Sequence, residues 1–262
     1  MIDLFHLKKS CQLIGMVHLQ PLPGSPQWAG NMKNLTQTAL HDAHNLIKGG
    51  CDAIIVENMG DVPYVKNNIA PETFAAMTLV VEKIVQLGIP TGIQILAAAN
   101  EQALSMAYVS GAAFIRVEGF AYAHVADEGW IDACAGMLLR KRSQLRAAVS
   151  IWSDVQKKHA SHSVTADLSL GDIAQGNKFC GADALVVTGK ETGKSTNPEN
   201  VKEAKKSGLP VIVGSGVTPN DAPLLAQHAN GLIVGSWLKK DGDWRNRVDV
   251  SRVKTLASIL RK

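Results

Sequence analysis

Residues 210–238 read PVIVGSGVTPNDAPLLAQHANGLIVGSWL, and this stretch decides the fold. It contains two short apolar runs, each followed at once by glycine and serine. Glycine lets a backbone approach a ligand closely. Loops of this kind after strands 7 and 8 form the phosphate-binding site of a (β/α)₈ barrel. The stretch therefore predicts the last two units of such a barrel, with a phosphate or another anion bound by Gly214, Ser215, Gly216, Gly235 and Ser236.

The segment Thr218-Pro219-Asn220-Asp221 is expected to open a helix directly after the first of these loops. The first N–H groups of a helix have no partner within it, and together with the helix dipole they favour an anion. The helix would thus add to the same site. The alternative is that both loops are ordinary turns between a strand and a helix.

Six further apolar runs precede this stretch, most of them separated by helical patterns. Near-continuous apolar strands indicate a parallel sheet covered by helices, and spacings of roughly 20 to 40 residues suit βα units. The eight runs are Leu13–His18, Ala53–Glu57, Thr91–Leu96, Phe114–Val117, Ala148–Asp154, Ala184–Thr188, Val211–Gly214 and Leu232–Gly235. We predict one (β/α)₈ TIM-barrel domain over residues 1–262. A doubly wound open sheet is the alternative fold.

The bulk composition narrows the class of protein. Of 262 residues, 46% are hydrophobic and 19% charged, and 27 basic against 23 acidic residues give a net charge of +4. So mild a charge does not favour nucleic acid as a partner. The four cysteines form no CxxC pair, which favours reduced thiols and a cytoplasmic location. With no secretory signal and no apolar run of about 18 residues, we expect no integral membrane contact.

Polar residues occupy alternate positions near the ends of the expected strands. If Ile115 and Val117 face the helices, then Arg116 and Glu118 face into the barrel. The same alternation turns Asp154 inward, and also Lys158 if the strand continues that far. Such residues lie at the C-terminal mouth, where barrels of this kind carry out their chemistry.

The resulting set of candidates comes from five different strands. The candidate catalytic residues are Glu57, Arg116, Asp154, Lys158 and His18, and Gln94, Glu118, Asp61 and His159 are further candidates for the mouth. Carboxylates beside a lysine and an arginine suit proton transfer next to a carbonyl group, with Arg116 holding an anionic group. Lys158 could instead form a Schiff base. The alternative without chemistry is a structural ion-pair network.

Residues 189–195 read GKETGKS and resemble a nucleotide-binding P-loop. That motif requires glycine at position 188, where this chain has Thr188. We therefore interpret the segment as the loop after the sixth strand, with Thr188, Thr192 and Gly193 near the phosphate. No cofactor is predicted. A divalent metal is compatible with the carboxylates at the mouth, although the sequence contains no compact ligand motif.

Several segments, distributed almost from end to end, resemble the BtpA family. They are Ile14–Leu19, Pro21–Pro26, Glu57–Pro63, Phe114–Val117, Asp154–Val155, Lys158–Ala160, Thr192–Gly193 and Gly214–Pro219. The resemblance implies a ribulose-phosphate-binding type of barrel, similar to phosphoribosylanthranilate isomerase and indole-3-glycerol-phosphate synthase. It implies no defined reaction. Many bacterial members carry Asn where this chain has Glu118, so this chain has an additional negative charge at the mouth.

These observations predict an enzyme that acts on a phosphorylated small molecule, either a sugar phosphate or a nucleotide-derived compound, as an isomerase, epimerase or lyase. The first alternative is a non-catalytic factor that binds a phosphorylated ligand or assists assembly. The second is nucleotide hydrolysis through residues 189–195. The oligomeric state is open, and a homo-oligomer is compatible with the sequence.

Overall fold

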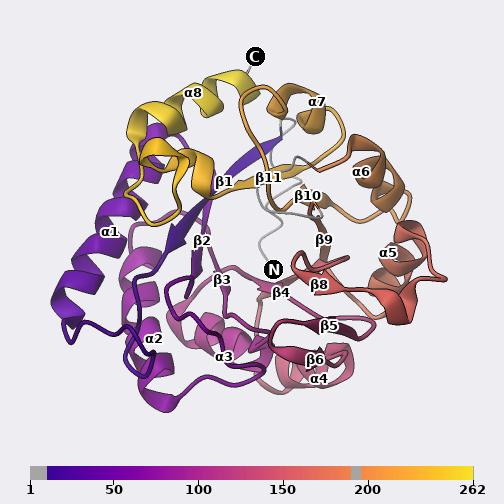
Figure 1. Cartoon of the computed structure of the whole chain (residues 1–262), viewed down its shortest axis with the longest axis horizontal. Helices are drawn as coiled ribbons and strands as arrows, with labels where there is room; N and C mark the ends of the chain where they lie inside the picture. Colours follow the sequence, from indigo (N-terminus) through magenta and orange to yellow (C-terminus); the bar gives the residue numbers. More distant parts are fainter. Residues whose placement is uncertain (1–10, 190–195, 262) are drawn as a thin grey trace.

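Eight parallel strands close into a barrel in this computed structural model, which describes residues 11–189 and 196–261 (Figure 1). Around the barrel the strands follow the order β1-β11-β10-β9-β7-β4-β3-β2. Their bounds are β1 (Gln12–His18), β2 (Ala53–Glu57), β3 (Thr91–Gln94), β4 (Phe114–Val117), β7 (Ser150–Asp154), β9 (Ala184–Val187), β10 (Val211–Val213) and β11 (Gly231–Val234). The predicted barrel is confirmed, and β1 pairs with both β2 and β11, so the sheet has no open edge.

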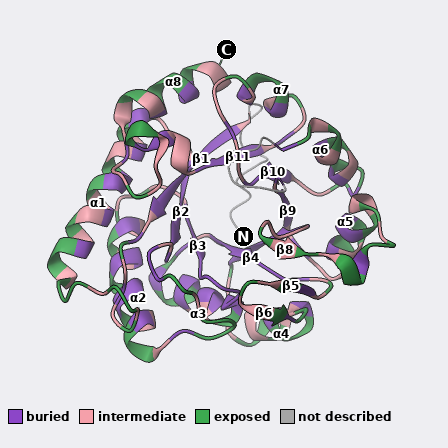
Figure 2. Ribbon diagram, viewed as in Figure 1, coloured by how far each residue is buried: buried purple, intermediate pink, exposed green. Residues whose placement is uncertain are grey.

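The barrel helices lie outside the ring of strands (Figure 1). They are α1 (Met32–Gly49), α2 (Pro71–Val85), α3 (Asn100–Ser110), α4 (Ala135–Gln144), α5 (Leu170–Phe179), α6 (Pro198–Lys205), α7 (Ala222–Ala226) and α8 (Val250–Leu260). Purple, buried positions in Figure 2 mark the helix faces that cover the sheet. The expected helix at Thr218 begins later, at Ala222. Residues 218–221 form a turn instead, in which the Thr218 hydroxyl donates to Asp221.

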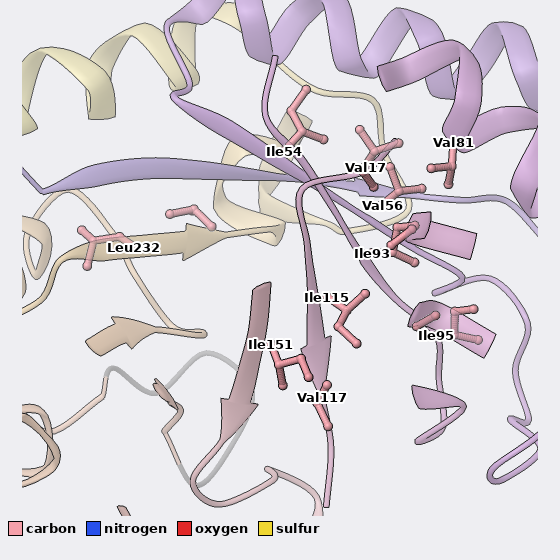
Figure 3. Close-up of a cluster of buried hydrophobic side chains, with 14 of the residues drawn as sticks. Val17, Ile54, Val56, Val81, Ile93, Ile95, Ile115, Val117, Ile151 and Leu232 are labelled. Carbon is pink, nitrogen blue, oxygen red and sulfur yellow. The ribbon is translucent and has the colours of Figure 1, made fainter. Parts of the chain in front are cut away.

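Side chains alternate along each strand between two hydrophobic clusters, as strand geometry requires. The inner cluster fills the barrel and includes Phe114 and Trp152, whose rings stack with centroids 3.6 Å apart. The outer cluster lies between the strands and the helices, and Figure 3 shows part of it, including Ile115, Val117 and Ile151. Phe114 and Trp152 thus face into the barrel, on the side of the strands predicted for Arg116 and Asp154.

A small antiparallel sheet lies apart from the barrel strands and was not predicted. It has the order β6-β5-β8, with β5 (His124–Ala126) and β6 (Gly129–Ile131) following β4, and β8 (Ala160–Ser161) following β7. Three short 3₁₀ turns, η1 (Ser163–Thr165), η2 (Ser236–Leu238) and η3 (Lys240–Gly242), lie in the loops that follow β7 and β11. The long segments after β4 and β7 thus pair with each other in one small sheet.

Candidate active site

A buried ion pair joins the ends of two neighbouring strands at the barrel mouth. Arg116 on β4 contacts Asp154 on β7, with Nη2 at 2.9 Å and Nε at 3.1 Å from Oδ1. Both residues are almost fully buried. Burial lowers the pKa of Arg116, but Asp154 outweighs burial and the pKa ends above its ordinary value. Arg116 therefore stays charged, and a charged guanidinium is a ready partner for a carboxylate or phosphate oxygen.

Glu57, at the end of β2, is a carboxyl group poised to exchange protons near neutral pH. Burial raises its pKa to about 7, although Arg116 and Lys158 oppose the shift. Its Oε2 lies 3.7 Å from Nε2 of His18, which ends β1. Burial lowers the pKa of His18 to about 3, so the imidazole is neutral and the contact is no ion pair. A carboxyl group with a pKa near the working pH suits general acid–base chemistry.

Two adjacent lysines follow β7 and differ in their surroundings. Lys158, one of the sequence candidates, lies where Arg116, Glu57 and Asp154 all influence its charge. Burial lowers the pKa of Lys158, and Arg116 lowers it further. Among the described residues Lys158 has no ion-pair partner within 4.0 Å. Of Arg116, Lys157 and Lys158, the last is thus the one cation without an ion-pair partner in the described chain.

Lys157 was missed by the sequence interpretation, which assigned the inward direction to its neighbour. Its Nζ lies 3.5 Å from Oε2 of Glu118 and 3.0 Å from Oε2 of Glu128. Burial lowers the pKa of Lys157, but the two carboxylates outweigh burial and hold the pKa above its ordinary value. Glu128 lies in the turn between β5 and β6. Lys157 therefore ties the small sheet to the barrel mouth.

Glu118 and Gln94 form a second polar group beside the ion pair. Gln94, paired with Glu57 in the sheet register, donates through Nε2 to Oε1 of Glu118 at 3.3 Å. The other carboxylate oxygen accepts from the backbone N–H of Ala98 at 2.9 Å. Burial raises the pKa of Glu118, and Lys157 opposes that shift. The Oε1 atom of Gln94 is buried and has no hydrogen-bond partner among the described residues.

The first predicted phosphate loop lies directly beside Arg116. A Cβ atom built on Gly214 would lie 3.3 Å from Nη2 of Arg116 and 2.7 Å from Cγ2 of Thr188. Ser215 follows, and its buried Oγ has no partner in the described part of the chain. The Ser215 carbonyl accepts a hydrogen bond from Thr196 at 3.3 Å, and Gly216 has a φ of +72°, which favours glycine. The loop thus places Gly214 against a buried guanidinium, and the next residue carries a hydroxyl without a described partner.

The second predicted loop lies beside His18. A Cβ atom on Gly235 would lie 3.0 Å from Cε1 of the imidazole, so a side chain there would require that ring to shift. Ser236 begins the 3₁₀ turn η2, and beyond it the ring of Trp244 meets His18 edge-on, with centroids 6.2 Å apart. His18 Nδ1 is a third buried atom without a partner in the described chain. The loop after β11 and the end of β1 therefore enclose one imidazole.

The remaining candidates lie in different surroundings. Asp61 accepts hydrogen bonds from the backbone of Leu22 at 2.8 Å and from Asn58 at 3.1 Å, and thereby holds the loop after β1. Asn58, which the sequence interpretation did not single out, also bonds to both backbone groups of Leu96. His159 is exposed, just beyond Lys158. The two positions Thr192 and Gly193 lie outside the described residues.

Neither a metal site nor a membrane segment is found within residues 11–189 and 196–261. No group of three or more His, Cys, Asp and Glu side chains there is arranged to hold a metal ion. No helix in the same part of the chain is long and apolar enough to cross a bilayer. The described groups at the mouth include Glu57, the Arg116–Asp154 pair, Lys158 and the two glycine loops.

Comparison with known proteins identifies relatives of this sequence. The model of the BtpA family matches residues 9–262. An uncharacterized protein of Caenorhabditis elegans, labelled mitochondrial, is 44% identical and aligns over 92% of this chain and 90% of its own length. The photosystem I biogenesis protein BtpA of Synechocystis sp. is 38% identical, over 95% of this chain and 87% of its own. The cytoplasmic location expected from the cysteines stays a prediction.

The fold also resembles solved structures of low sequence identity. Phosphoribosyl anthranilate isomerase from Thermus thermophilus superposes with a TM-score of 0.57 at 15% identity, covering 95% of this chain and 98% of its own. Identity at this level demonstrates a shared fold and no more. The barrel fold implied by the sequence resemblance is thereby confirmed.

Proposed function

The chain belongs to the BtpA family, and from that premise we propose that it is an enzyme acting on a phosphorylated small molecule at the C-terminal mouth of its barrel. The reaction class is isomerase, epimerase or lyase, and the substrate is a sugar phosphate or a nucleotide-derived phosphate. One observation carries the proposal: the guanidinium of Arg116 lies against Gly214, in the loop where barrels of this type bind phosphate.

The proposed anchor for the phosphate consists of the two glycine loops. Gly214 lets the backbone approach Arg116 closely, Gly216 takes a φ of +72°, and Ser215 supplies a hydroxyl that has no partner within the described chain. Gly235 and Ser236 flank the anion from the neighbouring strand. Arg116 adds the positive charge. A buried, unsatisfied hydroxyl costs free energy, which a bound phosphate would offset.

The proposed chemistry is proton transfer next to a carbonyl group. Glu57 serves as the acid–base group, because a pKa of about 7 allows it to both accept and release a proton near neutral pH. Lys158 and Arg116 stabilise the negative charge that develops on the carbonyl oxygen. Asp154 positions Arg116 through their ion pair. A lowered pKa also suits Lys158 to Schiff-base formation, as in a lyase.

A thermal-shift screen followed by turnover assays tests the proposal. Ribulose 5-phosphate, ribose 5-phosphate, glucose 6-phosphate and AMP are the first probes, and NMR follows conversion of any that raise the Tm. Glu57→Gln and Lys158→Met should each reduce turnover at least about 100-fold, the usual size of an acid–base contribution, while phosphate still raises the Tm. Borohydride trapping of substrate on Lys158 would identify the Schiff-base route. Wild-type turnover in both variants would refute the assignment.

A second candidate function is a binding or assembly factor without catalysis. The name of the Synechocystis relative, a photosystem I biogenesis protein, favours it. This candidate keeps the phosphate anchor and assigns no proton transfer to Glu57. It predicts that a phosphorylated ligand raises the Tm of wild type and Glu57→Gln equally, while NMR detects no conversion by either.

A further inference from the structure

Gln94 has a buried oxygen atom that the described part of the protein leaves unsatisfied. The side chain lies at the end of β3 and is 3% exposed as a residue. Its Nε2 donates to Glu118, whereas its Oε1 is buried and accepts no hydrogen bond from any described residue. Buried acceptors in folded proteins nearly always have a partner. The oxygen therefore requires a partner beyond the described residues.

Glu118 determines which atom of the Gln94 amide is left for a further hydrogen bond. Its Oε2 accepts from the Ala98 backbone, and Lys157 lies 3.5 Å from the same oxygen. Burial raises the pKa of Glu118, but Lys157 and the Ala98 N–H both stabilise the ionised form. An ionised carboxylate only accepts hydrogen bonds. The amide nitrogen of Gln94 must then face Glu118, which leaves the amide oxygen for another partner. The site thus offers an acceptor at this position.

This acceptor and the phosphate anchor lie on opposite sides of the barrel. In the strand order β1-β11-β10-β9-β7-β4-β3-β2, β3 and β10 are four strands apart in either direction. Figure 1 shows them facing one another across the ring. The unpartnered hydroxyl of Ser215 follows β10, and the unpartnered oxygen of Gln94 ends β3. Glu57 and Arg116 come from the strands on either side of β3.

We propose that Gln94 determines substrate specificity: its Oε1 accepts a hydrogen bond from a hydroxyl or amino group at the end of the ligand that is remote from the phosphate. The inference rests on the proposed function, because a phosphate at Ser215 defines the other end. The substrate class is an extended phosphate monoester that spans the mouth from β10 to β3. A monoester whose distal end carries only carbon and hydrogen would leave the Gln94 oxygen unsatisfied.

Three phosphates of increasing complexity test this inference by calorimetric titration at one ionic strength. Inorganic phosphate probes the anchor alone, n-pentyl phosphate adds a carbon chain, and ribitol 5-phosphate adds hydroxyl groups along the same chain. We expect wild type to bind ribitol 5-phosphate about 10- to 100-fold more tightly than n-pentyl phosphate, as a satisfied buried acceptor implies. In Gln94→Met this ratio should fall to within about threefold, while binding of inorganic phosphate is unchanged.

Two variants act as controls. Glu118→Gln keeps Gln94 but removes the fixed acceptor that orients it, so the preference for ribitol 5-phosphate should fall with no change for inorganic phosphate. Ser215→Ala should weaken all three probes by a similar factor. If Gln94→Met lowers the Tm too far to titrate, Glu118→Gln gives the same readout with the glutamine in place.

The outcomes separate the inference from the proposed function. Inorganic phosphate binding without a preference for hydroxyl groups in wild type overturns the inference alone, and so does a preference that survives in Gln94→Met. In those cases water supplies the partner of Gln94. Failure of all three phosphates to bind overturns the proposed function, and the inference falls with it.

Discussion

The Nη2 atom of Arg116 on β4 lies 3.3 Å from where a Cβ atom of Gly214, at the end of β10, would be. The side chain thus reaches a strand that is not its neighbour, since β7 and β9 lie between β4 and β10. Arg116 fills the space that the missing side chain of Gly214 leaves. The charged cluster and the glycine loop are in contact for this reason.

Substitution of Gly214 by alanine should therefore damage both packing and phosphate binding. The new Cβ would lie 2.6 Å from Cγ1 of Val186 and 2.7 Å from Cγ2 of Thr188, and would also displace Arg116. Overpacking of this kind costs about 1–3 kcal/mol. We expect a lower Tm and at least about tenfold weaker binding of inorganic phosphate by calorimetry. Gly136→Ala, on α4 and near only the tip of Arg140, is the control. It should lower neither the Tm nor the affinity for inorganic phosphate.

The Arg116–Asp154 pair predicts a large loss of stability when one charge is removed. Asp154→Asn keeps the shape of the side chain but leaves the buried guanidinium without its counter-charge. Loss of one partner of a buried ion pair costs about 3–5 kcal/mol. Chemical denaturation should measure this loss, and the double variant Arg116→Met/Asp154→Leu should recover much of it. An unchanged denaturation midpoint in Asp154→Asn would contradict the geometry of the pair.

Glu57 predicts a specific dependence of stability on pH. Burial raises its pKa from 4.5 to about 7, so the folded protein keeps this proton to a higher pH than the unfolded chain does. The stability contributed by the protonated form is complete below pH 4.5 and disappears as the pH rises to 7. Relative to wild type, Glu57→Gln should therefore gain on the order of 3 kcal/mol between these two pH values. Denaturation curves at each pH measure the difference.

The exposed Glu199 provides the control of opposite sign. Lys202 lowers the pKa of Glu199, so the stability from that carboxylate is present at neutral pH and disappears as the pH falls. Glu199→Gln should thus gain relative to wild type at low pH. A difference between wild type and Glu57→Gln that stays constant from pH 4.5 to pH 7 would show that Glu57 titrates normally.

Strand alternation in the sequence was sufficient to predict most of the barrel mouth. The period of two residues is a local property, so Glu57, Arg116 and Asp154 were turned inward without knowledge of the fold. The Gly-Ser pairs that begin at Gly214 and Gly235 marked the ends of the last two strands. The predicted barrel is confirmed because it depends on single strands and on the short turns that end them, whereas the roles of these residues stay predictions.

The features that were missed depend on contacts between distant segments. The chain bends after Asp154, where β7 ends, so alternation no longer assigns a direction to Lys157 or Lys158. Glu128 contacts Lys157 only because β5 pairs with both β6 and β8. No local pattern encodes these long-range pairings. The exception is local: the helix expected at Thr218 begins at Ala222, after a turn that the Thr218 hydroxyl closes with Asp221.

Lys157 should be the residue that holds the small sheet against the mouth. It is the cation shared by Glu118, at the end of the barrel strand, and Glu128, in the turn of the sheet. Lys157→Met would leave two buried carboxylates without this partner, and carboxylates in that position repel each other. The turn should then separate from the barrel, and the backbone amides of β5 and β6 should exchange hydrogen faster, by at least about tenfold.

Hydrogen exchange with mass spectrometry tests this prediction in the intact protein. Lys158→Met is the matched control, because the same charge is removed one residue along the chain while both ion pairs of Lys157 remain. Exchange in β5 and β6 should rise in Lys157→Met and stay at the wild-type rate in Lys158→Met, whereas amides of the barrel strand β2 should be unchanged in both. Equal exchange in the two variants would mean that the backbone pairing of β5 with β6 and β8 holds the sheet without the lysine.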